Sequence, residues 1–322
     1  MKILSSLQST SLIDLFTEQG RKMSCYTTDL WQIGIVQAPI QHIVTSGNLD
    51  GFRIKWITPD KSLTFLADPF GLWKKGSLYL FAESYDYRTR RGDIVAYKLN
   101  ADLDIIEQRT VLQEPWHLSY PFVFEADSEI WMLPEGYKSG ALTLYRAIEF
   151  PWRWEKVPDF SFPCAAIDAT PFYAQGKWWM FYTPPQPKAA RTDTLMLAHA
   201  AHLTGPWENV LQTAAHRDKS GARMGGTPFY HDGQIFLPTQ DCSRTYGGAL
   251  QMLALDPQRL LSPEFATSVH LAVPESAAPF IDGIHTLSGA GDVTFIDAKR
   301  HLKGSPQRLW VDLQRRIQKW GS

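Results

Sequence analysis

The sequence predicts an all-β fold, a five-bladed β-propeller preceded by a short N-terminal helix. Four stretches share one pattern: a Pro-Phe pair, a turn rich in Gly, Asp or Ser, and a strand that alternates aromatic and aliphatic residues. They read "DPFGLWKKGSLYLFAES" (68–84), "YPFVFEADSEIWMLPEG" (120–136), "TPFYAQGKWWMFYTPP" (170–185) and "TPFYHDGQIFLPTQDC" (227–242). Their prolines, Pro69, Pro121, Pro171 and Pro228, are 52, 50 and 57 residues apart, a period typical of propeller blades.

Each unit continues into a second strand pair, so that a unit has about four strands. The continuations "RGDIVAYKLN", "GALTLYRAIE", "DTLMLAHAAH" and "GALQMLALDP" alternate with little helical pattern. A degenerate fifth unit, "DGIHTLSGAGDVTFIDAKR", covers 282–300, and the strand "WQIGIV" (31–36) is expected to complete it, which closes the ring and removes an edge strand. We therefore expect a helix and lead-in over 1–30, a single propeller over 31–305 and a tail over 306–322.

Composition and charge limit the possible functions. The chain has 322 residues, 44% hydrophobic and 20% charged, with a net charge of −1, so nothing in it requires a nucleic-acid or membrane partner. The three cysteines, Cys25, Cys164 and Cys242, form no CxxC pair, which argues against a disulfide framework or a structural zinc site. No continuous apolar region suggests a signal peptide or a spanning helix, and we expect a cytoplasmic protein.

Function is expected at the propeller axis, where the inner strands of all blades meet. The residues just before each Pro-Phe pair are then spatial neighbours, and they include Asp68, Tyr120, Asp168 and Thr227, with His285 from the fifth unit. We expect these side chains to point into one cavity. A purely structural repeat would place small or apolar residues here, because clustered carboxylates repel one another.

Further polar residues stand where the second strands return toward the axis. Glu83, Glu135 and Asp241 follow their prolines by 14, 14 and 13 residues. The alternative is that they are ordinary strand-end charges paired with loop arginines. The turn "QDCSRTYGG" (240–248) adds groups that can hold a hydroxyl, carboxylate or phosphate. The candidate substrate-binding residues are Glu83, His117, Tyr120, Arg223, Asp241, Arg244, Tyr246 and His285.

These motifs resemble a known family. "ADPF…LYLFAE" resembles the first blade of the five-bladed propeller glycosidases, the arabinanase, β-xylosidase and levansucrase group. The stretches "FLADPF", "HLSYPFVFE", "QDCSRTYGGAL" and "DGIHTLSGAGDVTFIDAKR" together resemble more closely the N-terminal domain of plant glucosamine inositolphosphorylceramide transferases, of which we expect a bacterial member. The resemblance covers roughly residues 30 to 305.

The resemblance implies roles for three carboxylates. Asp68 matches the first-blade base or nucleophile of the glycosidases, and Asp168 stands near the place of their general acid. Tyr120 departs from the family, which has an Asp there. Glu135 is the third candidate catalytic residue. Glycosidic cleavage needs one protonated and one ionised carboxyl group, and we expect Asp168 to be the acid and Asp68 the ionised group.

Three functions remain open from the sequence. The first is a glycosidase-like enzyme acting on a glycosyl or N-ribosyl substrate in bacterial glycan or specialised-metabolite biosynthesis. The second is a non-catalytic sugar-recognition module that serves a transferase partner, and the third is a scaffold. We expect a small sugar-containing substrate and no cofactor. The alternative is an axial metal ion held by His117 and His285 together with Asp68, Asp168 and Glu135.

Overall fold

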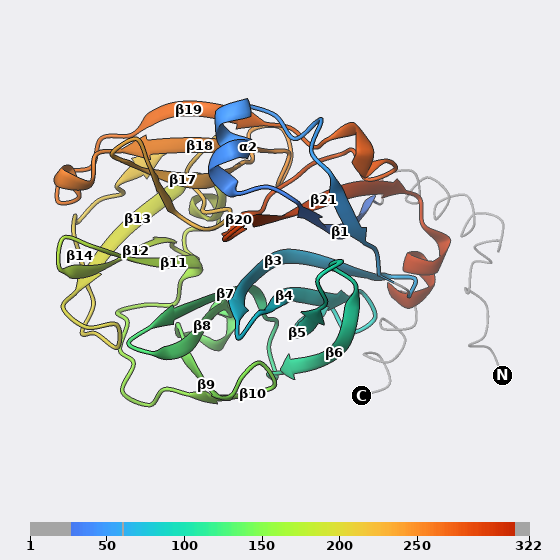
Figure 1. Cartoon of the computed structure of the whole chain (residues 1–322), viewed down its shortest axis with the longest axis horizontal. Coiled ribbons are helices and arrows are strands. Elements are labelled where there is room, and N and C mark those ends of the chain that lie inside the picture. Colours follow the sequence, from blue (N-terminus) through green and yellow to red (C-terminus); the bar gives the residue numbers. More distant parts are fainter. Residues whose placement is uncertain (1–26, 60, 313–322) are drawn as a thin grey trace, which may run out of the picture.

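The computed structural model describes residues 27–59 and 61–312, and five antiparallel sheets follow one another around a central axis (Figure 1). The fold is a five-bladed β-propeller, as predicted. Four blades are built from strands in chain order. The first contains β3 (Thr64–Lys74), β4 (Ser77–Asp86), β5 (Arg91–Leu99) and β6 (Ile105–Leu112), and the second contains β7 (Ser119–Ala126), β8 (Glu129–Glu135), β9 (Tyr145–Glu149) and β10 (Arg153–Lys156). The third contains β11 (Ile167–Ala174), β12 (Lys177–Thr183), β13 (Thr194–Ala200), β14 (Glu208–Asn209) and β15 (His216–Arg217), and the fourth contains β16 (Phe229–His231), β17 (Gln234–Asp241), β18 (Ala249–Leu255) and β19 (Ala266–Leu271).

The fifth blade joins the two ends of the described chain. Its inner strand β20 (Leu287–Ala290) pairs with β21 (Val293–Lys303), β21 pairs with β1 (Thr27–Val36), and β1 pairs with the outer strand β2 (Ile54–Ile57). Ten residue pairs join β1 to β21, from Thr27↔Lys303 to Val36↔Thr294. The predicted closure of the ring is confirmed, and the closing strand starts at Thr27, four residues before the predicted start at Trp31.

Short helices connect and cap the blades. Helix α2 (Ile40–Ser46) links β1 to β2 and buries Ile40, Ile43 and Val44. Four 3-10 turns lie between strands: η1 (Tyr137–Ser139), η2 (Lys188–Thr192), η3 (Pro257–Arg259) and η4 (Glu275–Ala277). Residues 306–312 are helical, within the segment expected to be a tail. The helix expected in 1–30 falls mainly on residues outside the described part. No helix of the described residues is long and apolar enough to cross a membrane.

The repeated motif supplies the core and the hairpins. Phe70 and Phe122 are buried, and their ring centroids lie 5.3 Å apart in a cluster shared by neighbouring blades. The turn pairs Lys75-Gly76 and Gln175-Gly176 have positive φ at both positions, which matches the right-handed twist of tight hairpins. Cys164 and Cys242 are free thiols, and Cys25 lies outside the described residues.

A β-bulge near the start of three inner strands decides which residues face the axis. Asp68, Tyr120 and Asp168 each have a positive φ, of 51°, 46° and 48°, within register shifts of β3, β7 and β11. Asp168 is therefore the structural counterpart of Asp68. Pro171 pairs with Met180 in the regular ladder and is not the counterpart of Pro69, which corrects the alignment of the third unit on its proline.

Candidate functional site

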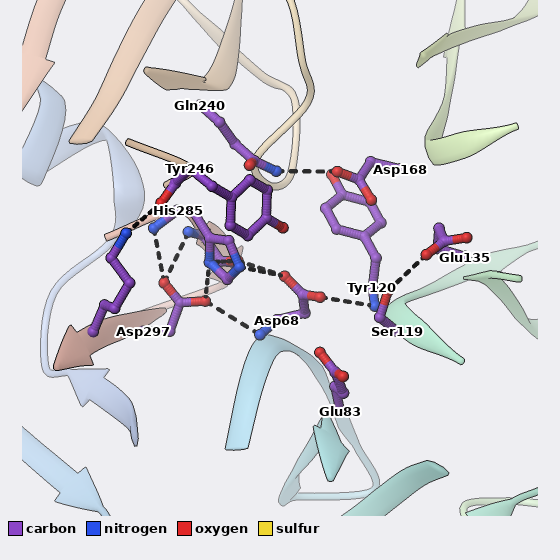
Figure 2. A network of polar contacts seen from close by, with 12 residues as sticks. Asp68, Glu83, Ser119, Tyr120, Glu135, Asp168, Gln240, Tyr246, His285 and Asp297 are labelled. Atoms are coloured by element: carbon purple, nitrogen blue, oxygen red, sulfur yellow. Dashed lines mark hydrogen bonds and ion pairs between the residues drawn. The ribbon is translucent and has the colours of Figure 1, made fainter. Parts of the chain in front are cut away.

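Carboxylates from three blades meet in one network of polar contacts, two from bulged residues and two from the second strands β4 and β8 (Figure 2). Asp68, Glu83, Glu135 and Asp168 are only 5%, 5%, 4% and 2% exposed. Glu83 and Glu135 sit at equivalent places, because Ala67 pairs with Glu83 and Ser119 pairs with Glu135. The structure therefore brings these four candidate site residues together.

Asp68 is held by groups from the two adjacent blades. Its Oδ2 accepts a hydrogen bond from the backbone N–H of Tyr120 at 3.1 Å, and its Oδ1 accepts one from the Thr286 hydroxyl at 3.1 Å. The Nε2 atom of His285 lies 3.6 Å from the same Oδ1. Burial raises the pKa of Asp68 to about 6, although His285 acts in the opposite direction.

His285 forms a buried chain of charges with Asp297. The Nδ1 of His285 lies 2.5 Å from Oδ2 of Asp297, and the imidazole stacks on Trp31 with ring centroids 3.9 Å apart. Burial alone would lower the pKa of His285, but the carboxylates of Asp297 and Asp68 raise it above its usual value. The two carboxylates therefore favour the protonated form of the imidazole that lies between them.

Asp297 is a site residue that the sequence reasoning missed. Burial opposes its charge, but His285 and its hydrogen bonds lower the pKa of Asp297 below the usual value. It accepts hydrogen bonds from the backbone N–H groups of Asp68, His285 and Thr286. The signal that could have found it is an acid inside the apolar run "VTFIDA", on the second strand of the blade like Glu83 and Glu135.

Asp168 is neutralised within the fold. Its Oδ2 accepts hydrogen bonds from Arg223 Nε at 2.6 Å and from Gln240 Nε2 at 3.0 Å. Arg223 also donates to the backbone oxygen of Arg191, and its guanidinium lies 5.0 Å from the centre of the Tyr246 ring. Tyr246 is 39% exposed and lies edge-on to His285, so Arg223 and Tyr246 form the outer layer of the cluster.

Glu135 and Glu83 are buried acids whose pKa values lie above the usual range. Burial and the charge of Asp168 raise the pKa of Glu135 to about 7, while its oxygens accept hydrogen bonds from Ser119 Oγ and from the N–H of Tyr137. Burial and the neighbouring acids raise the pKa of Glu83 well above its usual value. Glu83 and Glu135 therefore hold their protons to a higher pH than a solvated glutamate does, whereas the nearby Asp297 ionises more readily than usual.

His117 flanks Glu83 at the edge of the cluster. Its Nδ1 accepts a hydrogen bond from Gly92 N–H at 2.9 Å, and its Nε2 lies 3.7 Å from Glu83 Oε1. Burial lowers the pKa of His117 to about 4, so the ring is neutral and Nε2 carries its proton. Gly92 has no room for a side chain, because a Cβ there would lie 2.7 Å from Glu83 Oε1.

Tyr120, a predicted substrate-binding residue, is enclosed at the axis, and its backbone N–H rather than its hydroxyl contacts Asp68. The side chain is fully buried. Its hydroxyl lies 2.9 Å from Thr170 Oγ1, donates to the Gly226 carbonyl and accepts from the Gly226 N–H. Gly226 is required there, because a Cβ would lie 1.8 Å from the Leu287 carbonyl oxygen. Thr227, also expected to point inward, donates its backbone N–H to the same carbonyl.

Two predicted binding residues lie outside the cluster. The Asp241 carboxylate turns away from the axis and lies 3.3 Å from His270 Nε2, while Gln240 faces Asp168. Successive side chains of a strand point to opposite faces, so the one-residue offset exchanges their positions. Arg244 is exposed in the turn after β17 and has no hydrogen bond or ion pair with other described residues.

A metal ion would find one small donor set here. Ligand atoms of Asp68, His285 and Asp297 all lie within 4.8 Å of one another. Metal binding requires a neutral imidazole, whereas the Nδ1 of His285 is engaged by Asp297 and the two carboxylates favour its protonated form. The residues therefore fit an ion-paired relay better than a metal site.

The comparisons with known proteins place this site in a family. Residues 57–276 match the family model described as "Glucosamine inositolphosphorylceramide transferase 1, N-terminal". The chain is 34% identical over 269 residues to glucosamine inositolphosphorylceramide transferase 1 of Oryza sativa subsp. indica, covering 76% of this chain and 36% of the relative. It is 33% identical over 196 residues to the protein of that name from Arabidopsis thaliana, covering 60% of this chain and 26% of the relative. The chain thus spans about a third of the length of these relatives.

Solved structures agree on the fold. The family 117 glycoside hydrolase Zg3597 of Zobellia galactanivorans has a TM-score of 0.54 at 12% identity, covering 78% of this chain and 89% of that one. The α-L-arabinofuranosidase PaAbf62A of Podospora anserina has a TM-score of 0.55 at 11% identity, covering 76% and 94%. The matched relatives are plant proteins and give no support to a bacterial source. The chain belongs to the family of glucosamine inositolphosphorylceramide transferase 1 N-terminal domains.

Proposed function

We propose that the chain is a glycosidase-like enzyme that cleaves or transfers a glycosyl group at the axial carboxylates. The observation that carries the proposal is the buried group of Asp68, Glu83, Glu135 and Asp168, in which protonated and ionised carboxyl groups stand side by side. A structural repeat alone gives no reason to bury four acids together, since each costs desolvation free energy.

Glu135 is better suited than Asp168 to donate the proton. A proton on Asp168 Oδ2 would disrupt the 2.6 Å ion pair with Arg223, whereas a pKa of about 7 leaves Glu135 able to protonate a leaving oxygen at neutral pH. This assignment replaces the expected acid role of Asp168. Asp168 and Arg223 then act as a pair that positions the substrate at the outer layer of the axial cluster.

Asp68 is the ionised partner in this proposal. With a pKa of about 6 it is mainly charged at pH 7, and the His285 imidazolium stabilises that charge. Thr286 and the Tyr120 N–H orient the carboxylate, so the relay Asp297–His285–Asp68 holds the base or nucleophile in one position. Turnover should therefore fall below pH 6, where Asp68 gains a proton, and above pH 7, where Glu135 loses one.

The test is a turnover assay on a panel of aryl glycosides and nucleotide sugars, with released sugar followed by chromatography. Asp68→Asn and Glu135→Gln should each lower turnover by about 10²–10⁴-fold, as expected for loss of a base or an acid. Asp241→Asn is the matched control, because Asp241 faces His270 away from the cluster. Equal turnover in Asp68→Asn and the control, at equal stability, would rule out the enzyme.

The second candidate is a sugar-recognition module that serves a transferase. It is supported by the Arg223–Asp168 ion pair and by the two thirds of the plant relatives that lie beyond the matched region. Binding of a sugar without turnover on any glycoside in the panel would favour it. A bacterial source, a biosynthetic role and a cytoplasmic location remain predictions of the same proposal.

A further inference from the structure

A cavity of about 290 Å³ lies beside the axial cluster, between the first and second blades. It is formed by the turn between β4 and β5, the segment that leads into β7 and the 3-10 turn η1, all at the end of the blades where the carboxylates meet. A water molecule occupies about 30 Å³ in the liquid, so the cavity has room for a phosphate and part of an attached sugar. Its lining residues are Thr89, Arg90, Arg91, Pro115, Trp116, His117 and Lys138.

The lining is cationic and contains no acid. Lys138 is exposed and forms no ion pair with the residues of 27–59 and 61–312. Arg91 Nε lies 3.4 Å from Asp93 Oδ1, yet neither atom has a hydrogen-bond partner within the described chain. His117 is neutral, and Arg90 and Arg91 lie beside Asp312 and Asp93, so the uncompensated positive charge of this wall comes from Lys138.

The rim of this cavity already binds a carboxylate of the chain. Asp312, in the helical segment 306–312, places Oδ1 2.6 Å from Arg90 Nη2. The Arg90 side chain is 51% exposed, and the second oxygen of Asp312, Oδ2, accepts a hydrogen bond from Arg308 Nε at 3.0 Å. The Arg90 guanidinium is therefore positioned to hold an oxygen anion.

His117 connects the cavity to the axial acids. It lines the cavity, and its Nε2 lies 3.7 Å from Glu83 Oε1 in the cluster. A ligand group bound here would be next to the carboxylates without touching them. This separation matters because the ionised acids repel an anion, whereas the cations of the cavity attract it.

We propose that this cavity binds an oxyanion substituent, a phosphate or a carboxylate, of the sugar substrate whose glycosidic bond lies over the axial carboxylates. The inference rests on the proposed function and names its substrate class as anionic glycosides. The anionic group anchors the substrate at Lys138 and the adjacent arginines, and the neutral sugar ring extends past His117 to Asp68 and Glu135.

The experiment measures binding of three probes by titration calorimetry: α-D-glucose 1-phosphate, D-glucuronic acid and methyl α-D-glucoside. We expect one of the two anions to bind and methyl glucoside to bind at least tenfold more weakly. Lys138→Gln should weaken binding of the anion by about tenfold or more, and added salt should weaken this binding further. Lys177→Gln is the matched control, an exposed lysine in the β11–β12 turn at the opposite end of a blade.

The two anions show whether the cavity prefers a phosphate or a carboxylate, because the preferred group is the one carried by the anion that binds more strongly. Binding of all three probes alike, no binding of either anion, or equal effects of Lys138→Gln and Lys177→Gln would overturn the proposal. The Asp68→Asn variant separates it from the proposed function. Lys138-dependent anion binding that survives in Asp68→Asn, together with no turnover in the wild type, would leave the anion site standing and reject the enzyme.

Discussion

His285 Nδ1 and Asp297 Oδ2 lie 2.5 Å apart, and their side chains are 3% and 0% exposed. Asp297 also accepts the backbone N–H of Asp68 in the first blade. The pair therefore joins the last blade to the first at the point where the chain closes its ring. The same contacts orient the carboxylate of Asp68, so closure and the candidate site share one set of interactions.

Asp297→Asn should destabilise the protein strongly. Removing one partner of a buried ion pair leaves the other charge uncompensated, which costs about 3–5 kcal/mol in free energy of unfolding. Asp29→Asn is the matched control, because Asp29 pairs with His301 at 2.6 Å with side chains 33% and 28% exposed, and it should cost less than about 1 kcal/mol. Urea unfolding measures both, and equal losses would contradict the structural importance of Asp297.

The Arg223–Asp168 pair should behave as a coupled unit. Arg223→Gln leaves a carboxylate that is 2% exposed without its cation, and it should cost about 3–5 kcal/mol in stability. The double variant Arg223→Gln/Asp168→Asn should recover part of this loss, because no charge remains buried. A double-mutant cycle from urea unfolding measures the coupling, and additive single effects would show that the pair contributes nothing.

Glu135 should make stability fall as pH rises. Its pKa is raised from 4.5 to about 7, so the folded state holds this proton more tightly than the unfolded chain. The stabilisation is complete below pH 4.5 and is lost as pH rises to about 7. Between pH 5 and pH 8 the melting temperature of the wild type should fall relative to that of Glu135→Gln. A constant difference would refute the raised pKa.

Tyr120→Phe should lower the free energy of unfolding without changing sugar binding at the axial cluster. The lost hydroxyl leaves the N–H and the carbonyl of Gly226 without their partner, at a cost of about 1–3 kcal/mol, whereas Thr170 still donates to the Asp168 carbonyl. Tyr246→Phe is the opposite case, because Tyr246 is 39% exposed and should change stability by less than about 0.5 kcal/mol. Weakened sugar binding in Tyr120→Phe at unchanged stability would return this residue to the site.

The sequence by itself determined the blade repeat, the closing strand and the gathering of Asp68, Asp168 and His285, and it left open whether Glu83 and Glu135 join them. These follow from local patterns, since strand alternation, hairpin turns and a period of about 50 residues are visible along the chain. The order of blades around an axis then makes equivalent positions neighbours. Tertiary structure was not needed to place these side chains at one end of the propeller.

The tertiary structure decided which side chains pair with which. The bulge in β11 places Asp168, not Thr170, at the position equivalent to Asp68. The alternation of side chains along β17 places Gln240, not Asp241, against Asp168. Tyr120 is buried at the axis, where its hydroxyl donates to the Gly226 carbonyl. Asp297 became a site residue only through contacts with residues more than 200 positions away, such as the N–H of Asp68. Pairing and burial set the pKa of each acid, and both depend on three-dimensional neighbours that carry no spacing pattern in the sequence.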